Sequence, residues 1–362
     1  MQVIMKPLLQ ALLGIAFLCF NTSLSTCSGH NGVLSPGTPH KFANLNRVDR
    51  ARNTRGSGFK TLNGVDRAKT GLEDVTHLYI SPNPYEFLAC LKGIEKIPQP
   101  PLRYYDKLSK KISKDFYDRE QLTEWQKAVR DRIVPPIMVF MIKEQIIAKG
   151  KPIIKNKIIC LAWSGEGPIP TTNFCQKIKE QFKNLKQVFV CGICGCSNPK
   201  VDFGTLCISK HLMYIERFSL GTPHDEELNF AFKTDSFFCR KRYIKSFSVS
   251  NFSFISAHLA RIASLAGIDH CDSVNISGPI FFGHPTTTAQ LAKLAKEKHD
   301  CDTCAFNMED GIFSQSFPQA LLLRFVSDHG DSASDGISGP GKNIALDSLT
   351  RAVTVSITNR HF

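Results

Sequence analysis

The sequence predicts an α/β protein with a mixed, mostly parallel central sheet that is flanked by helices. Three observations lead to this prediction. Apolar runs alternate with segments of helical spacing from about residue 75 to 357, two of the runs break into glycine-rich turns, and no internal repeat or second linker interrupts the alternation. Because α/β sheets place ligands where a buried strand ends in such a turn, the segments at 164–167 and 191–196 mark the expected site.

The expected elements follow from apolar and β-branched runs and from helical spacing. Strands are expected at residues 75–80, 137–142, 157–163, 188–190, 273–277 and 320–326. Helices are expected to begin within residues 81–94 and to form at 104–132, 171–182, 252–266, 287–298, 305–317 and 344–357. A Gly-Lys-Pro turn signal between the second and third strands predicts that these two strands are neighbours.

The N-terminal region has the composition of a targeting segment. Residues 7–20 form an apolar run that is too short to cross a bilayer as a stable helix, and a polar stretch follows. We therefore expect residues 1–27 to be a signal peptide, rather than a membrane anchor or an N-terminal core helix. Residues 28–73 are poor in large apolar side chains and are expected to be a basic, disordered leader, which leaves 74–362 as one domain.

Charge and cysteine content exclude some classes of function. The net charge of +13 is spread through lysine-rich stretches and is not combined with aromatic residues, so a solvated surface is expected and a nucleic-acid partner is not. Thirteen cysteines include two C-x-x-C units, at 191–194 and 301–304. The two units lie more than a hundred residues apart, unlike a compact zinc module, so free or disulfide-bonded cysteines are expected and neither a metal ion nor a cofactor is.

Three segments carry a resemblance to a known family. The segment VFVCGICGCSNPKVDFGTLCIS at 188–209, NMEDGIFSQ at 307–315 and LRFVSDHGD at 323–331 follow one another in the family's order, with SGEGP upstream. They resemble the nucleoside phosphorylase and nucleosidase superfamily, and GICGCSNP is most similar to plant bark storage and wound-induced members. The resemblance covers residues 75–357 and implies the same α/β fold.

The resemblance also implies roles for individual residues. Glu309 matches the carboxylate that binds ribose hydroxyls and Met308 the side chain that packs on the sugar, although a helix N-terminal carboxylate would show the same pattern. Asp328 matches the aspartate that protonates or hydrogen-bonds the purine, with Ser327 orienting it, whereas the plainer interpretation is a turn-capping aspartate. Glu86 matches the glutamate that activates water in nucleosidases, although a single helical glutamate usually faces solvent.

The remaining implied contacts concern the base and the backbone. Phe281 matches an aromatic residue that stacks on the base, with Phe282 as the competing candidate and simple core packing as the alternative. Gly192 and Gly195 would let the backbone approach the ligand closely. Gly165, together with the glycine two residues later, would line the part of the site that binds phosphate or water.

Four departures from the family pattern restrict the expected reaction. Phosphorylases place an arginine and a serine, which hold phosphate, where this chain has Val190 and Ile193. The family's aspartates after two further glycines are replaced here by Thr205 and Pro279. The missing phosphate ligands disfavour phosphorolysis, so hydrolysis or no catalysis remains. The two missing aspartates concern the geometry of the site around the base.

The leading expectation is a secreted protein that binds a purine nucleoside or base and hydrolyses its N-glycosidic bond. The alternative is a non-catalytic storage or defence protein that retains the fold. A homo-oligomer is compatible with either, no transmembrane segment is expected, and the final compartment would be extracellular or vacuolar. In the secretory pathway Asn251 and Asn275 are glycosylation sequons, and Asn251 is the better acceptor because Asn275 falls on an expected buried strand.

Overall fold

The computed structural model of the chain describes residues 72–98, 101–103, 112–114, 116–117, 136–148, 151–216, 219–220, 227–232, 235–240, 243–279, 285–330 and 340–359. All of them belong to the second of two compact units into which the chain divides, Asp66–Phe362. The expected signal peptide, nearly all of the leader and most of the helical stretch at 104–132 lie outside the described residues. Among the helices in the described ranges, none combines the length and apolar character that a membrane crossing requires.

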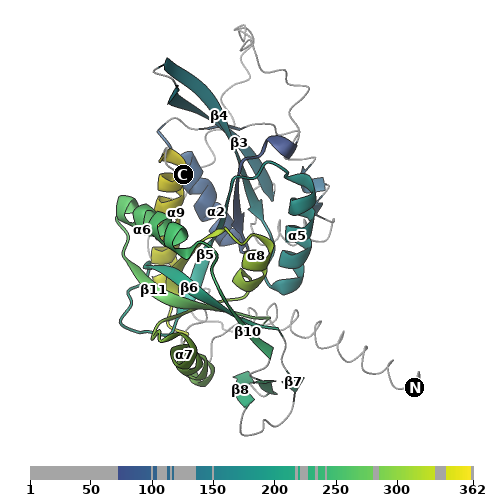
Figure 1. The fold of residues 1–362 in the computed structure, drawn as a ribbon, viewed down its shortest axis with the longest axis vertical. Coiled ribbons are helices and arrows are strands. Elements are labelled where there is room, and N and C mark those ends of the chain that lie inside the picture. The colour runs from purple at the N-terminus through teal and green to yellow at the C-terminus, as the bar shows by residue number, and fades with distance from the viewer. Residues whose placement is uncertain are drawn as a thin grey trace, which may run out of the picture. The chain divides into compact units, whose positions relative to one another are not determined.

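The central sheet has ten strands (Figure 1). They are β1 (His77–Ser81), β2 (Leu102–Arg103), β3 (Ile137–Ala148), β4 (Lys151–Trp163), β5 (Gln187–Cys196), β6 (Leu206–Ile215), β10 (Ile244–Ser248), β11 (His270–Ser277), β12 (Cys304–Asn307) and β13 (Leu321–Asp328). A separate small sheet contains β7 (Ser219–Leu220), β8 (Glu227–Phe232) and β9 (Asp235–Arg240). The expected mixed α/β class with a central sheet is confirmed.

Part of the central sheet closes into a ring. The strand order is β10-β6-β11-β12-β5-β1-β4-β3-β2, and β13 pairs with both β5 and β6. The path β6-β11-β12-β5-β13 therefore returns to β6. Strand β10 pairs with β6 outside the ring, and β1, β4, β3 and β2 continue outward from β5. Figure 1 shows that the hairpin of β3 and β4 extends beyond its neighbours.

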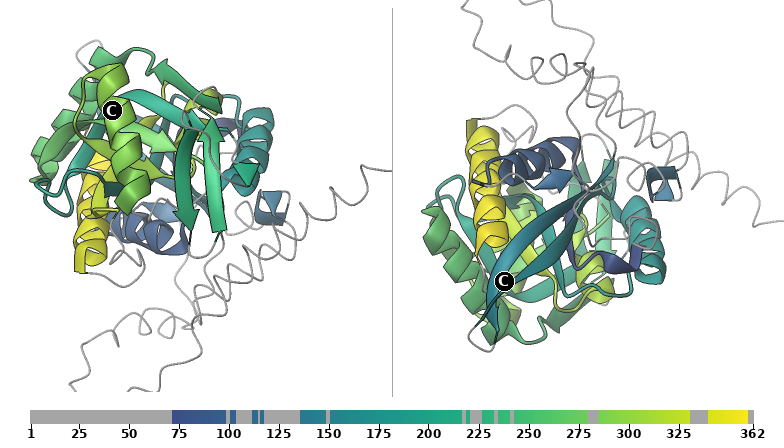
Figure 2. Two further views of the ribbon diagram at one scale, coloured as in Figure 1. Left: turned by 90° about the horizontal axis from the view of Figure 1, so that it is seen from below. Right: turned by 90° about the horizontal axis from the view of Figure 1, so that it is seen from above.

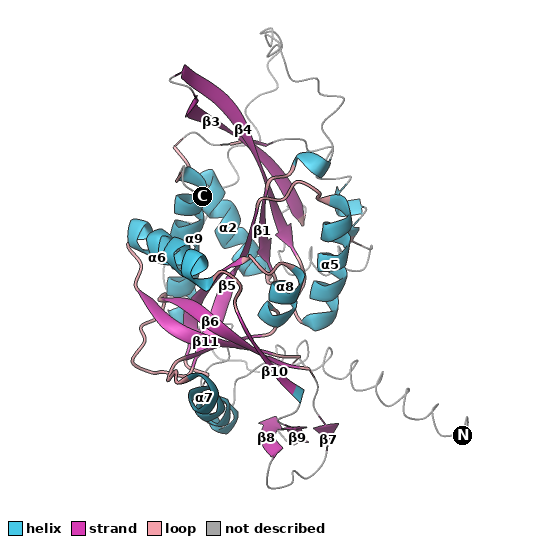
Figure 3. Cartoon of the chain, viewed as in Figure 1, coloured by secondary structure: helices cyan, strands magenta, loops and turns pink. Residues whose placement is uncertain are grey.

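Five of the six described helices form two groups on opposite sides of this sheet, and α7 (Pro285–His299) packs against β11 and β8 (Figure 1). The other five are α2 (Pro84–Glu95), α5 (Pro168–Gln181), α6 (Phe252–Ala266), α8 (Asp310–Ser316) and α9 (Pro340–Thr358), and a short 3₁₀ turn, η2 (Leu72–Asp74), precedes β1. Helices α2, α6 and α9 lie together on one side, and α5 and α8 lie on the other (Figures 1 and 2). Figure 3 shows the strands between these two groups. The main core contains apolar residues from both faces, with Phe87, Phe189 and Phe325 fully buried.

The glycine-rich segment at residues 191–196 has a different structure from the one expected. Residues 191–196 were expected to form a turn, but β5 continues through Cys196. Its first half pairs with β1, its last residues pair with β12, and β13 runs along its other edge. These partners on both edges supply the backbone hydrogen bonds that hold an extended conformation, despite the two glycines.

A second correction concerns the segment before α8. Residues 305–307 were expected to begin a helix, but they belong to β12, and α8 begins only at Asp310. The parallel pairing of β12 with β11 satisfies the backbone of these residues in the sheet. The structure also contains β6 and β10, which the pattern of apolar runs did not indicate.

Candidate active site

The centre of the candidate site is a buried ion pair between β13 and α8. Arg324 Nε lies 3.0 Å from both carboxylate oxygens of Asp310, and Arg324 Nη2 lies 2.5 Å from Asp310 Oδ1. Arg324 is 2% exposed and Asp310 is fully buried. A bidentate pair of this kind combines charge with fixed geometry, so it fixes the guanidinium of Arg324 between β13 and α8.

Asp310 is in turn positioned by neighbouring strands. Asn275 Nδ2 donates to Asp310 Oδ2 at 2.7 Å, and Asn307 Nδ2 donates to Asn275 Oδ1 at 2.9 Å. Asn307 Oδ1 accepts from the backbone N–H of Asp310 at 2.9 Å, and Ser277 Oγ accepts from that of Gly311 at 2.8 Å. The ends of β11 and β12 thus satisfy the first backbone donors of α8, which a short helix leaves unpaired.

Glu86 reaches the same guanidinium from α2. Its Oε1 accepts from the backbone N–H of Ile193 at 2.8 Å and lies 3.9 Å from Arg324 Nη1. Its Oε2 accepts from the backbone N–H of Asn83 at 3.0 Å, which completes a capping box at the start of α2. The alternative interpretation, a helical glutamate that faces solvent, is wrong here, because Glu86 is only 4% exposed.

Glu309 approaches Arg324 from the other side. Its Oε2 lies 3.6 Å from Arg324 Nη2, and its Oε1 accepts from the backbone N–H of Gly167 at 2.9 Å. Glu309 is the residue directly before α8, but its side chain makes no capping hydrogen bond to that helix. The structure therefore places this carboxylate in the buried cluster and not in a helix cap.

Among the described residues of this cluster, the guanidinium of Arg324 is the one positive charge, and it faces three buried carboxyl groups. It cannot neutralise all three, so burial raises the pKa values of the two glutamates. Burial raises the pKa of Glu86 to about 8, and Arg324 and two backbone N–H donors oppose this effect. Burial also raises the pKa of Glu309 to about 7, against Arg324 and the N–H of Gly167. Burial acts to lower the pKa of Arg324, but Asp310 and the two glutamates raise it overall. Both glutamates are thus close to the range in which a carboxyl group exchanges protons at neutral pH.

The two glycines of β5 provide the space in which these side chains lie. A Cβ at Gly192 would lie 2.1 Å from Arg324 Nη1 and 2.6 Å from Glu86 Oε1. A Cβ at Gly195 would lie 2.9 Å from Asp328 Oδ1. The absence of side chains at both positions lets charged groups from α2 and β13 cross the face of a strand.

Asp328 lies at the end of β13, beside Gly195. Its Oδ2 accepts from Ser327 Oγ at 2.9 Å, and its Oδ1 accepts from the backbone N–H of Gly330 at 2.9 Å. Ser327 Oγ also lies 3.1 Å from the carbonyl oxygen of Cys194. Two hydrogen bonds therefore fix the orientation of the Asp328 carboxylate at the end of β13, four residues after Arg324.

The SGEG segment contacts the cluster through its backbone. Gly165 and Gly167 have φ values of 84° and 86°, which favour glycine, and a Cβ at Gly165 would lie 2.8 Å from Pro170. Met308 is half-buried, and its Cε lies 3.8 Å from the position that a Cβ of Gly167 would occupy. This segment also contacts the start of α2, because the side-chain amide of Asn83 donates to Glu166.

The structure treats the predicted aromatic, glycosylation and phosphate-binding positions differently. Phe281 and Phe282 lie outside the described residues, so the stacking prediction stays a prediction. Asn275 is 1% exposed and hydrogen-bonded within the cluster, whereas Asn251 is exposed directly before α6. At the positions of the expected phosphate ligands, Val190 is fully buried and Ile193 is held by its backbone contact with Glu86.

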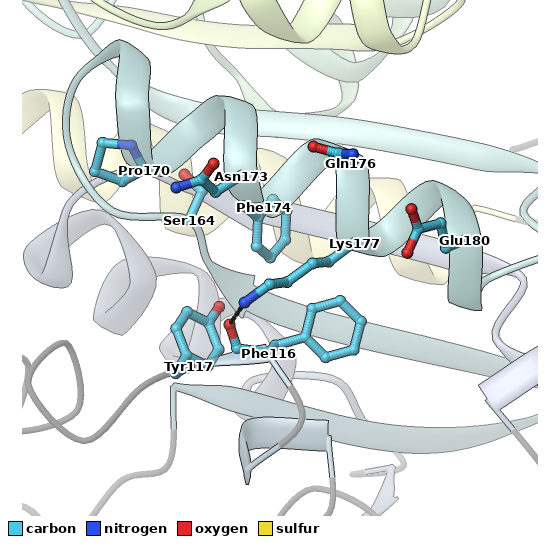
Figure 4. Close-up of a pocket in the computed structure, with 9 residues that line it drawn as sticks. All are labelled: Phe116, Tyr117, Ser164, Pro170, Asn173, Phe174, Gln176, Lys177 and Glu180. Atoms are coloured by element: carbon cyan, nitrogen blue, oxygen red, sulfur yellow. Dashed lines mark hydrogen bonds between the residues drawn. The ribbon is translucent and has the colours of Figure 1, made fainter.

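A cavity lies beside this cluster rather than in it. It has a volume of about 430 Å³ and lies between α5 and residues 116–117, with Phe116, Tyr117 and Phe174 among its walls (Figure 4). Lys177 crosses it and donates to the carbonyl oxygen of Phe116 at 2.8 Å. Ser164, the first residue of the SGEG segment, is part of its lining, and the carboxylates of the cluster are not in its walls.

Across the described ranges, no group of three or more His, Cys, Asp or Glu side chains could hold a metal ion.

Sequence reasoning did not assign a role to Arg324 or Asp310. Arg324 interrupts the apolar run ALLLRFV, and a charged residue within a buried strand requires a partner of opposite charge. That signal could have identified the arginine. It could not have selected Asp310, because several carboxylates follow expected strands.

Comparisons with known proteins give matches among solved structures. Neither protein-family models nor curated proteins match the chain. A 5'-methylthioadenosine/S-adenosylhomocysteine nucleosidase from Helicobacter pylori is 13% identical, with a TM-score of 0.45, over 79% of this chain and 97% of that one. The corresponding enzyme from Neisseria meningitidis is 14% identical, with a TM-score of 0.46, over 78% and 98%. A purine nucleoside phosphorylase from Toxoplasma gondii is 12% identical, with a TM-score of 0.43, over 80% and 94%.

Proposed function

We propose that this protein binds a purine nucleoside and hydrolyses its N-glycosidic bond. The observation that carries the proposal is the convergence of Glu86 and Glu309 on Arg324 beside Gly192, with Asp328 at Gly195 of the same strand. Hydrolysis of this bond needs a carboxylate to hold the sugar, a base to activate water and an acid to protonate the departing base. The cluster supplies a carboxyl group for each task.

The contacts support a division of these tasks. Glu309, with Met308 beside it, binds the ribose, and its contact with Gly167 fixes one oxygen while the other faces Arg324. Glu86 serves as the base for water, and Asp328, oriented by Ser327, protonates or hydrogen-bonds the purine. A Glu86 carboxyl with a pKa of about 8 is roughly one-tenth ionised at pH 7, so hydrolysis should accelerate as the pH rises toward 8.

Two positions argue against phosphate as the attacking group. Val190 and Ile193 offer neither a guanidinium nor a hydroxyl, and the guanidinium of Arg324 is already engaged by Asp310. Phosphate without charge-assisted donors is held weakly. Water is therefore the proposed nucleophile.

The test is a cleavage assay of the purified chain against inosine, adenosine and methylthioadenosine, with and without phosphate. We expect free base and free sugar at a rate that phosphate does not change. Ribose 1-phosphate that appears only when phosphate is present would contradict the proposal of hydrolysis. Tight nucleoside binding without turnover would favour the non-catalytic alternative, in which the fold serves storage or defence.

We further propose that the chain enters the secretory pathway through its N-terminal apolar run and carries a glycan on Asn251. A glycan on Asn275 would require this side chain to leave its contact with Asp310 inside the sheet, whereas Asn251 is exposed. Expression in a secretory host, followed by deglycosylation of wild type, Asn251→Gln and Asn275→Gln, tests this. The mass shift should disappear only in Asn251→Gln, and an intact N-terminal segment in the secreted protein would contradict signal cleavage.

A further inference from the structure

Four cysteine thiols from three strands lie close together next to the candidate site. This thiol cluster consists of Cys194 and Cys196 of β5, Cys207 of β6 and Cys271 of β11. Cys207 is at its centre, because its Sγ lies 4.0 Å from that of Cys194 and 4.0 Å from that of Cys271, and it also interacts with Cys196. All four are free thiols in the structure. The proposed hydrolysis uses none of them.

Exposure distinguishes the members of the cluster. Cys194, Cys196 and Cys207 are at most 3% exposed, whereas Cys271 is only half-buried and lies in β11 between the exposed residues His270 and Asp272. Hydrogen bonds with the thiols of Cys194, Cys196 and Cys271 raise the pKa of the Cys207 thiol, and burial raises it further. A reagent from solvent therefore reaches Cys271 first, and Cys207 can react only with a neighbour.

Strand pairing selects the neighbour with which Cys207 can form a bond. Cys207 and Cys271 are register partners on the hydrogen-bonded parallel strands β6 and β11. Adjacent strands lie about 4.8 Å apart, which is within the Cα separation that a disulfide spans. Cys194 and Cys207, in contrast, have β13 between their strands and are not at the same level of it, because Cys194 is opposite Val326 and Cys207 is opposite Arg324. This offset of two residues, about 6.6 Å along the strand, adds to a lateral separation of more than one strand spacing, so their backbones lie beyond the disulfide limit of about 7 Å.

We propose that Cys207 and Cys271 are a disulfide-forming pair that closes when the protein meets a small disulfide oxidant. The Cys271 thiolate attacks one sulfur of the oxidant, breaks its S–S bond and releases the first thiol. The Cys207 thiolate then attacks the Cys271 sulfur in the mixed disulfide and releases the second thiol. Two cysteine thiols are oxidised to one disulfide, the oxidant is reduced to two thiols, and the two cysteine protons pass to the released thiolates.

The disulfide would join β6 and β11, two strands that contact or carry residues of the candidate site. Cys207 is the register partner of Arg324, and β11 carries Asn275, which holds Asp310, and Ser277, which holds the start of α8. The bond would also close a loop of about 65 residues and thereby restrict the unfolded chain. We expect oxidation to raise the thermal midpoint of unfolding by about 5 °C or more, and a reductant to reverse the increase.

The test uses the purified full chain and oxidised glutathione, followed by alkylation of free thiols under denaturing conditions and digestion with trypsin. The peptides 201–210 and 262–293 each contain a single cysteine, Cys207 and Cys271 respectively. The expected result is a glutathione-dependent, reducible cross-link between these two peptides, together with the higher thermal midpoint.

Matched variants decide between the cluster members. Cys271→Ser should abolish both the cross-link and the thermal shift, whereas Cys301→Ser should keep both, because Cys301 is equally half-buried but its thiol faces the carbonyl oxygen of Thr303. A link from peptide 201–210 to peptide 187–200, which contains Cys191, Cys194 and Cys196, would overturn the proposal. Alkylation of both Cys207 and Cys271 in the wild type after oxidation would also overturn it, and this outcome requires no variant to fold.

Discussion

Arg324 binds Asp310 through two of its nitrogens, at 2.5 and 3.0 Å, while both side chains are almost entirely removed from solvent. Glu86 and Glu309 lie further from the same guanidinium, at 3.9 and 3.6 Å. The arginine is therefore mainly engaged in a structural pair, and the two glutamates are left incompletely neutralised. Because Asp310 is closer to Arg324 than Glu309 and Glu86 are, the buried arginine does not prevent the pKa values of these two glutamates from rising to about 7 and about 8.

Asp310→Asn should destabilise the fold strongly. The substitution keeps the shape of the side chain but leaves Arg324 without its closest counter-charge, and breaking one side of a buried pair typically costs 3–5 kcal/mol. Because Glu309 and Glu86 are close enough to compensate in part, we expect a loss of about 3 kcal/mol in the free energy of unfolding, measured by denaturant titration.

An exposed ion pair offers the control for this prediction. Asp347 and Arg351 form an i,i+4 pair on α9 at 3.3 Å, with half of each side chain in solvent. Asp347→Asn should therefore change the free energy of unfolding by at most about 0.5 kcal/mol. Equal effects of the two substitutions would show that the Asp310–Arg324 pair contributes nothing particular to stability.

Gly192→Ala should disturb the cluster more than Gly195→Ala does. The added methyl group would lie 2.1 Å from Arg324 Nη1, in a region where Arg324 and Glu86 are buried and have no room to move. At Gly195 the contact is 2.9 Å, to a carboxylate of Asp328 that is only half-buried and able to shift. We expect a loss of roughly 2–3 kcal/mol for Gly192→Ala and about 1 kcal/mol for Gly195→Ala in thermal or denaturant unfolding. The reverse order would contradict the placement of these side chains.

The parts of the fold that could be predicted from sequence depend on local patterns. The helix at Phe252–Ala266 was predicted with the bounds that the structure has, because apolar residues recur at helical spacing and a glycine follows. The strand before Asp328 was likewise predicted, since its apolar run is nearly continuous. In both cases neighbouring residues alone determine the element.

The parts that could not be predicted depend on distant partners. The segment CGICGC resembles a turn by composition, and only the partners on both of its edges make it a strand. Similarly, nothing near Arg324 in sequence indicates that Asp310 is its partner and that Glu86 and Glu309 flank it. The carboxylates that the family resemblance indicated do lie around one strand, but their roles in a reaction remain predictions.

Glu86→Gln should make the stability of the protein less sensitive to pH. Glu86 has a pKa of about 8 when folded, compared with 4.5 as its ordinary value, so the folded state retains a proton that the unfolded state releases. The stability due to this proton is fully present below pH 4.5 and is lost as the pH rises through 8. The free energy of unfolding of the variant, relative to wild type, should therefore increase between these two pH values by a few kcal/mol. A difference that stays constant with pH, measured by denaturant titration, would contradict the raised pKa.

Asp328→Asn should slow release of the base by about a hundredfold, the usual scale for loss of a general acid, while nucleoside binding changes little. The amide oxygen can still accept one of the two hydrogen bonds that Ser327 and Gly330 donate to Asp328, but the amide has no proton of suitable acidity to give to the purine. Single-turnover cleavage and equilibrium binding of inosine separate these two effects. Asp269→Asn is the matched control, because Asp269 is exposed, and it should leave both quantities unchanged. Full activity of Asp328→Asn would remove Asp328 from the proposed reaction, whereas weaker binding with an unchanged cleavage rate would make it a binding residue only.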